Sequence, residues 1–206
     1  MSLTSEHDED GGQPRGREEI RVAVIEAAND LFGEKGPDAV SIRDVAKRAR
    51  VNHGLVHRHF GTKEQLLREV MRNYANAFMR QAEDVPSVDV ATRKMLQVMT
   101  EQPSFVRIVA HLLLSGHEAE EFVAESGGLA LLAQLTQKEA GLSAKEGQLL
   151  SAASTAMCMG WVLFESFLLA GAGFEGDIDE ARNYIRELAD DLWAQKLRTG
   201  KNDVPA

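Results

Sequence analysis

Hydrophobic residues recur along most of the chain at intervals of three and four, the spacing of one face of an α-helix. In the N-terminal part this pattern predicts a first helix over residues 17–32 and a second that begins at Ser41. It also predicts a short third helix over 53–59 and a long fourth from Thr62 to about residue 83. We find no convincing period-two alternation of the kind that marks a half-buried strand. The sequence therefore predicts an all-α fold.

A short motif marks the expected start of three helices. In a capping box, a serine or threonine hydroxyl accepts a hydrogen bond from the backbone three residues later, and the side chain there returns the bond. Three pairs have this spacing: Ser41 with Asp44, Thr62 with Gln65, and Ser143 with Glu146. Asn52 is a further candidate cap, for the short third helix.

Beyond residue 83 the pattern predicts a helical bundle. Its expected helices cover about 88–100, 104–115, 120–139, 143–171 and 178–197. The stretch from Leu149 to Phe174 carries one charge, Glu165, and is long enough to raise the question of a membrane span. Its serines and alanines, and the lack of a cationic flank directly after it, favour a helix buried in protein. One bundle would cover only part of such a helix, so we expect a homodimer and no membrane.

Charge is distributed unevenly along the chain, whose net charge is -9. Residues 15–82 hold 13 lysines and arginines against 9 acidic residues, whereas residues 1–14 and 83–206 are acidic. A basic N-terminal third suggests a nucleic-acid partner, and residues 1–14 are expected to form a disordered acidic tail. The single cysteine, Cys158, and the lack of a signal-peptide pattern predict a cytoplasmic protein without a disulfide framework.

Three histidines, His53, His57 and His59, fall within seven residues. They lie on the second member of two short helices joined by a tight turn, over 41–60, an arrangement typical of a helix-turn-helix. Such a helix enters the DNA major groove by its N-terminal end. His53 and His57 are also four residues apart, a spacing at which two imidazoles can bind zinc, but no third ligand is evident nearby. DNA contact is the interpretation that we favour over a metal site or an ordinary polar surface.

The stretch SIRDVAKRARVNHGLVHRHFGTKEQLL, with FGEKGPDAVS and the helix before it, resembles the DNA-binding signature of the TetR family of bacterial transcriptional regulators. The resemblance covers roughly residues 17–70 and rests on the apolar spacing of the second helix, Gly54, Phe60 and the TKEQLL that opens the fourth helix. It implies an N-terminal three-helix DNA-binding domain and a C-terminal helical bundle for ligand binding and dimerisation. By position it implies these DNA-binding residues: Ser41, Arg43, Asn52, His53, Gly54, Leu55, His57, His59 and Lys63.

Two residues depart from the family's usual pattern. Arg50 occupies a turn position where the family usually has glycine, so a left-handed backbone is expected there at some cost. His57 stands where a tyrosine is common. Both departures bear on the operator sequence more than on the fold.

Methionine and aromatic residues beyond the helix-turn-helix are candidates for an effector cavity, because their side chains adapt to apolar ligands. The candidates are Met71, Tyr74, Phe78, Met99, Phe105, His111 and Trp161. Plain core packing is the alternative for each of them. The chain lacks a nucleophile elbow, a phosphate loop, HExxH and CxxC, so we predict no enzyme, no cofactor and no metal.

Together these features predict a tail over 1–14, a DNA-binding domain over 15–62 and a ligand-binding and dimerisation domain over 63–206. The chain is predicted to be a homodimeric transcriptional regulator, and we favour a repressor over an activator. A small apolar or amphipathic effector would release it from a palindromic operator of double-stranded DNA. The alternative is a helical small-molecule-binding protein without specific DNA binding.

Overall fold

The computed structural model describes residues 16–82, 87–118, 128–140 and 142–188, together with Pro14 and Asp191. These residues are helical with short connections and contain no strand, so the all-α prediction is confirmed. Apart from Pro14, the predicted tail lies outside the described residues.

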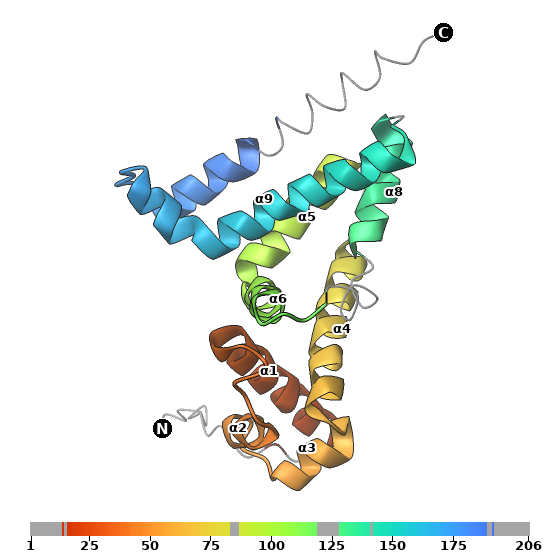
Figure 1. The fold of residues 1–206 in the computed structure, drawn as a ribbon, viewed down its shortest axis with the longest axis vertical. Helices are drawn as coiled ribbons and strands as arrows, with labels where there is room; N and C mark the ends of the chain where they lie inside the picture. The colour runs from red at the N-terminus through yellow and green to blue at the C-terminus, as the bar shows by residue number, and fades with distance from the viewer. Residues whose placement is uncertain are drawn as a thin grey trace, which may run out of the picture.

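The helices follow one another in the predicted order. They are α1 (Arg17–Lys35), α2 (Ile42–Arg48), α3 (His53–Phe60), α4 (Lys63–Ala82), α5 (Val88–Glu101), α6 (Ser104–Leu114), α8 (Gly128–Ala140) and α9 (Ala144–Gly171). A last helical segment covers 178–188. In Figure 1, α1 to α3 form one end of the molecule, and α4 runs from them to the bundle of α5, α6, α8 and α9. The expected start of a helix near residue 120 lies outside the described residues.

Local hydrogen bonds explain where three of these helices begin. The Ser41 hydroxyl accepts from the Asp44 amide at 3.2 Å, and the Ser41 amide donates to the Asp44 carboxylate at 2.9 Å. The other two predicted capping boxes form in the same way: Thr62 with Gln65, and Ser143 with Glu146. Each box satisfies two backbone donors at a helix start, which stabilises the helix by about 1 kcal/mol.

Helix ends and turns show where the backbone adopts positive φ. The first helix continues three residues past the predicted Phe32 and stops at Gly36, which has φ 81°. Arg50, in the turn between α2 and α3, has φ 54°, which confirms the expected left-handed conformation at a non-glycine residue. Such a conformation costs an L-residue about 1–2 kcal/mol.

Two clusters of buried side chains hold the molecule together. The first joins α1, α2, α3 and α4 to Ile108 and Leu112 of α6, so its members lie on both sides of residue 62. The second joins α5, α6, α8 and α9. The fourth helix belongs to both, because Tyr74 is buried in the first cluster and Phe78 packs against the second.

The helices α1 and α6 approach each other closely. A Cβ atom built on Gly33 would lie 2.8 Å from the Cβ of Ser104, and one on Gly36 would lie 3.0 Å from the ring of His111. At Gly33 a side chain would force the helices apart, and at Gly36 it would have to displace the His111 ring. The bundle therefore rests directly on the helix that supports α2 and α3.

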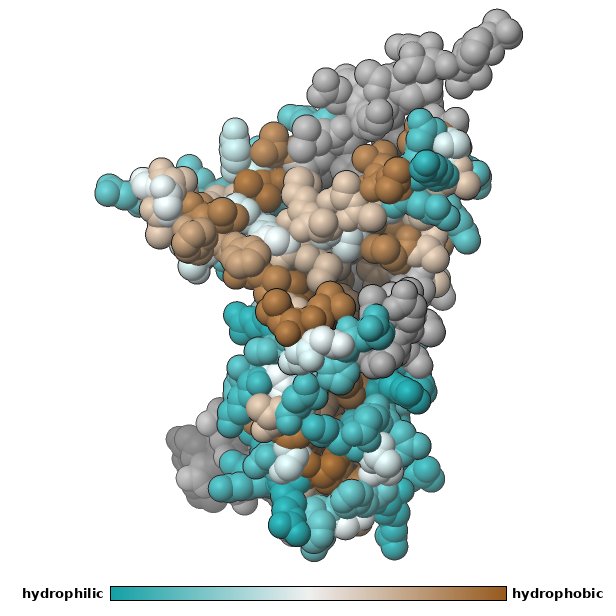
Figure 2. Space-filling model, viewed as in Figure 1, coloured by the Kyte–Doolittle hydropathy of each residue, from teal (hydrophilic) through white to brown (hydrophobic). Residues whose placement is uncertain are grey.

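The helix α9 has an inner face of small residues and an outer face of large apolar ones. Its buried residues are Gly147, Ser151, Ser154, Thr155 and Cys158. Burial raises the pKa of the Cys158 thiol to about 11, so the thiol is protonated at neutral pH. Figure 2 shows hydrophobic residues concentrated over the bundle, whereas polar ones cover most of the opposite end. By length and composition alone, α9 is the one helix in the described residues that could span a bilayer.

Candidate nucleic-acid interface

The turn between α2 and α3 sets the angle of the third helix. The Val51 amide donates to the Ala46 carbonyl at 3.0 Å, across the left-handed Arg50. Val56 and Phe60 of α3 are buried in the first cluster and hold the helix against α2 and α4. The opposite face of α3 is left facing solvent.

Most of the predicted contact residues lie on this exposed surface. Ser41, Arg43, Asn52, His53, Gly54 and His57 are all exposed. Leu55 lies differently, because it is half-buried and packs against the first cluster. Its side chain therefore contributes to the core as well as to the exposed surface. His59 and Lys63 are half-buried at the edge of the surface.

Several of these polar groups already have intramolecular partners. Asn52 caps α3 as predicted, its side-chain oxygen accepting from the Gly54 amide at 2.8 Å. The Lys63 ammonium donates to the Pro37 carbonyl at 3.0 Å, which uses one of its three donors. The rings of His53 and His57 meet edge to face, with centroids 6.4 Å apart. In the described part of the chain, no three His, Cys, Asp or Glu side chains gather as a metal site would require.

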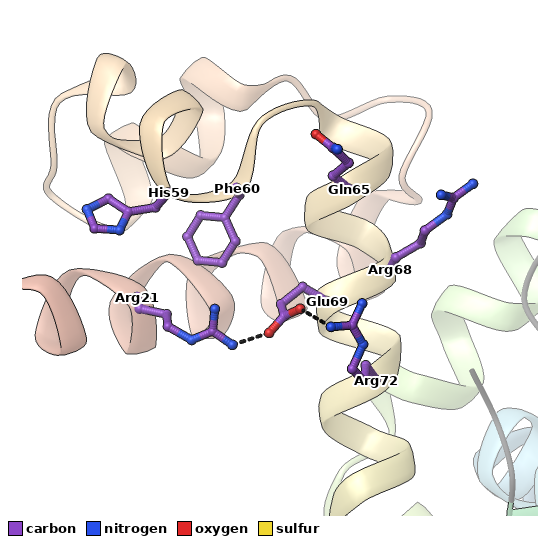
Figure 3. Close-up of a pocket in the computed structure, with 7 residues that line it drawn as sticks. All are labelled: Arg21, His59, Phe60, Gln65, Arg68, Glu69 and Arg72. Carbon is purple, nitrogen blue, oxygen red and sulfur yellow. Dashed lines mark hydrogen bonds and ion pairs between the residues drawn. The ribbon is translucent and has the colours of Figure 1, made fainter. Parts of the chain in front are cut away.

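Beside α3, a hollow of about 290 Å³ opens between α1 and α4. Its lining residues are Arg21, His59, Phe60, Gln65, Arg68, Glu69 and Arg72. Figure 3 shows the Glu69 carboxylate between two arginines, pairing with Arg21 on one side and with Arg72 at 3.0 Å on the other. The Arg21 guanidinium also lies over the Phe60 ring, 5.8 Å from its centroid. This cluster fixes α1 and α4 next to the recognition helix.

We expect Glu69→Gln to lower the free energy of unfolding by about 1–3 kcal/mol, because it weakens two charge-assisted hydrogen bonds at a side chain only 18% exposed. Glu34→Gln is the matched control, since Glu34 pairs with Arg48 at 3.0 Å but is 50% exposed. That variant should lose less than about 0.5 kcal/mol. Urea denaturation of both variants measures the difference. Equal losses would show that the Glu69 cluster does not fix the helices.

The predicted effector residues fall into separate surroundings. Met71 and Tyr74 are buried in the first cluster, and Met99 is buried in the second. Phe105 packs against both clusters, and its ring centroid lies 5.0 Å from that of Tyr74. Tyr74 donates to the Asn29 side chain, and burial raises its pKa to about 12. The structure therefore brings Tyr74 and Phe105 together where the two clusters meet.

The remaining effector candidates have other neighbours. Phe78 is half-buried against the second cluster, and His111 lies beside Gly36, directly after α1. The Trp161 indole donates to the Glu165 carboxylate at 2.9 Å. Glu165 in turn accepts two hydrogen bonds from Arg182, both at 2.8 Å, which tie the 178–188 segment to α9.

This arrangement of a short, polar recognition helix on a larger helical bundle defines the class of helix-turn-helix transcriptional regulators. The family described as "Bacterial regulatory proteins, tetR family" matches residues 24–70. The HTH-type transcriptional repressor Rv3405c of Mycobacterium tuberculosis (strain ATCC 25618 / H37Rv) is 33% identical to this chain over 195 residues, covering 94% of this chain and 90% of the relative. The chain belongs to the tetR family, as its signature predicted, and is a DNA-binding transcriptional regulator.

Solved structures show the same fold. A transcriptional regulator of the "TerR/AcrR family" from Aquifex aeolicus VF5 has a TM-score of 0.64 at 17% identity, covering 85% of this chain and 98% of that chain. The fatty acid degradation regulator FadR from Bacillus halodurans has a TM-score of 0.63 at 16% identity, covering 82% of this chain and 97% of that one. Both similarities extend through the C-terminal bundle as well as the helix-turn-helix.

Proposed function

We propose that the chain is a repressor that binds a near-palindromic operator as a homodimer and leaves it when a small apolar or amphipathic effector binds. The observation that carries the proposal is the exposed polar face of α3. His53, His57 and Arg58 are exposed there, whereas Val56 and Phe60 are buried, and the three polar side chains do not belong to the core cluster. The repressor Rv3405c, similar over nearly the whole chain, supports the direction of regulation.

On DNA, α3 would enter the major groove and the residues around it would hold the backbone. The exposed N-terminal part of α3, Asn52 to His57, supplies the base readout, because only side chains near this end reach base edges. Arg43 of α2, His59 near the end of α3 and Lys63 at the start of α4 would fix the register of this helix on phosphates. Phosphate contacts made by so few cations give a moderate salt dependence.

The outer face of α9 is the proposed dimer interface. Phe164 and Phe167 are 54% and 75% exposed, and large apolar residues continue along α9 and the 178–188 segment. The exposed members include Leu163, Leu168, Ile178, Tyr184 and Leu188. A contiguous apolar surface of this kind is typical of an interface with another chain. The same pair of helices from a second copy would cover it as a four-helix bundle.

The effector is proposed to bind between α4 and the bundle. The ring contact between Tyr74 and Phe105 lies where the two clusters meet, so a ligand inserted there would move α4 relative to α6. Because α4 is joined to α3 through Gly61 and Thr62, its displacement would change the separation of the two recognition helices. Effector and operator would then weaken each other's binding by a coupling of about 1–3 kcal/mol.

We further propose that the protein acts in the cytoplasm, without catalytic activity and without a bound metal or cofactor. The alternative, a helical small-molecule-binding protein without specific DNA binding, is not favoured, because the transcriptional repressor Rv3405c is similar over 94% of this chain. That alternative function also leaves the exposed histidines of α3 without a role.

Selection from random duplexes, followed by fluorescence anisotropy at several salt concentrations, tests the proposal. We expect a selected sequence with two related half-sites, about 34–36 Å apart from centre to centre. Light scattering of the complex should give two chains per duplex. Weak binding that is equal for selected and scrambled duplexes would contradict the proposal.

A further inference from the structure

His57 forms a closed pair of hydrogen bonds with Gly61 at the end of α3. The Gly61 amide donates to the His57 carbonyl at 2.9 Å, and Nδ1 of the His57 ring lies 2.9 Å from the Gly61 carbonyl oxygen. Gly61 has φ 75°, a conformation that glycine adopts without strain, and this turns its carbonyl toward the ring. The ring is thus held in one orientation on an exposed surface.

This geometry determines which nitrogen carries the proton. A carbonyl oxygen has no proton to donate, so Nδ1 of His57 must be the donor. In a neutral imidazole the other nitrogen, Nε2, then presents a lone pair. Among the described residues nothing hydrogen-bonds to Nε2, and the ring's other contact is with His53. The neutral His57 side chain therefore offers an acceptor to whatever it meets.

The groups available in DNA differ in what they offer this acceptor. Phosphate oxygens, guanine O6 and N7, adenine N7 and thymine O4 are themselves acceptors, and they would require a second proton on the ring. In the major groove, the donors are the exocyclic amino groups of adenine and cytosine. A neutral His57 ring with this hydrogen-bond polarity therefore matches one chemical class of partner.

We propose that Nε2 of His57 accepts a hydrogen bond from the exocyclic amino group of an adenine or cytosine in each half-site. The residue is then a determinant of operator sequence. While the ring is neutral and Nδ1 donates to Gly61, Nε2 can only accept. The inference rests on the proposed binding of α3 to the operator and does not depend on the effector.

The experiment removes the amino groups one at a time from a duplex selected by the native protein. Each adenine is replaced by purine and each cytosine by 2-pyrimidinone, and anisotropy gives the affinity of the native protein, His57→Ala and His53→Ala. At one position per half-site, we expect the loss of the amino group to weaken native binding by about five- to tenfold. His57→Ala should be insensitive at that position, whereas His53→Ala should keep the native sensitivity.

Two results would overturn this inference. One is that His57→Ala responds to every analogue as the native protein does. The other is that native affinity rises from about pH 8 to about pH 6, where imidazoles gain a proton, and that His57→Ala loses this rise. The second result would mean that a cationic ring holds a phosphate. Melting curves of both variants establish that they are folded. The symmetry of the selected sequence tests the palindromic operator separately.

Discussion

Replacing Phe164 and Phe167 together by aspartate is expected to separate the dimer and to lower operator affinity by about a hundredfold or more. The two side chains are 54% and 75% exposed on α9, and the proposed interface would bury both. Aspartates in the same place would have to lose their hydration without a partner. A monomer binds one half-site and loses the gain in affinity that comes from binding two half-sites at once.

Light scattering and anisotropy on the same samples measure both effects. The control is Leu114→Asp, because Leu114 is 87% exposed but lies at the end of α6. That variant should stay dimeric and bind the operator with native affinity. A dimeric Phe164→Asp/Phe167→Asp variant with native affinity would show that the subunits meet elsewhere.

Replacing Ile108 by alanine is expected to lower the free energy of unfolding by about 2–5 kcal/mol and to weaken operator binding. Ile108 belongs to α6, outside residues 15–62, yet its side chain is fully buried in the cluster formed by α1 to α4. The close contact between Gly33 and Ser104 leaves little freedom for α6 to move into the space left. The lost packing should therefore loosen the core against which α3 is held.

Leu114→Ala is the matched control, since it truncates an aliphatic side chain on the same helix at an 87% exposed position. Its free energy of unfolding should change by less than about 0.5 kcal/mol. Urea denaturation measures the free energy of unfolding of both variants. Similar small losses in the two would show that α6 does not complete the core of the DNA-binding end.

The parts of the structure that depend on neighbours in sequence could be predicted. The boxes at Ser41, Thr62 and Ser143 each join residues three apart, so the sequence alone contains the whole interaction. The left-handed Arg50 was expected from the resemblance, because the family usually has glycine at this turn position. The helix-turn-helix followed because its signature combines several such local features.

Contacts between distant segments could not be predicted in the same way. The ion pair formed by Arg21 and Glu69 joins residues 48 apart in the sequence. Only the other ion pair of this cluster, Glu69 with Arg72, joins residues close enough on one helix to be predicted from their spacing. The bond from Lys63 to the Pro37 carbonyl depends on how α4 meets the loop after α1. Hydrophobic periodicity also gave no sign that Leu55 would share its surface between the core and solvent.

The effector residues show a different limit. Tyr74 and Phe105 meet, but this depends on the angle between α4 and α6, which the sequence pattern does not contain. Composition could indicate that adaptable apolar side chains are abundant, and could not indicate which of them face one another. The seven candidates therefore remain a prediction that effector-binding experiments would test.

The central claim is that the recognition helices of a dimer enter successive major grooves on one face of the DNA. Inserting about five base pairs between the half-sites of the selected operator tests it most directly, because this turns one half-site by roughly half a helical turn. We predict that affinity falls by about a hundredfold, toward that of a single half-site. Unchanged affinity for the duplex with the insertion would contradict the account, since the two helices would then not be reading the DNA as a fixed pair.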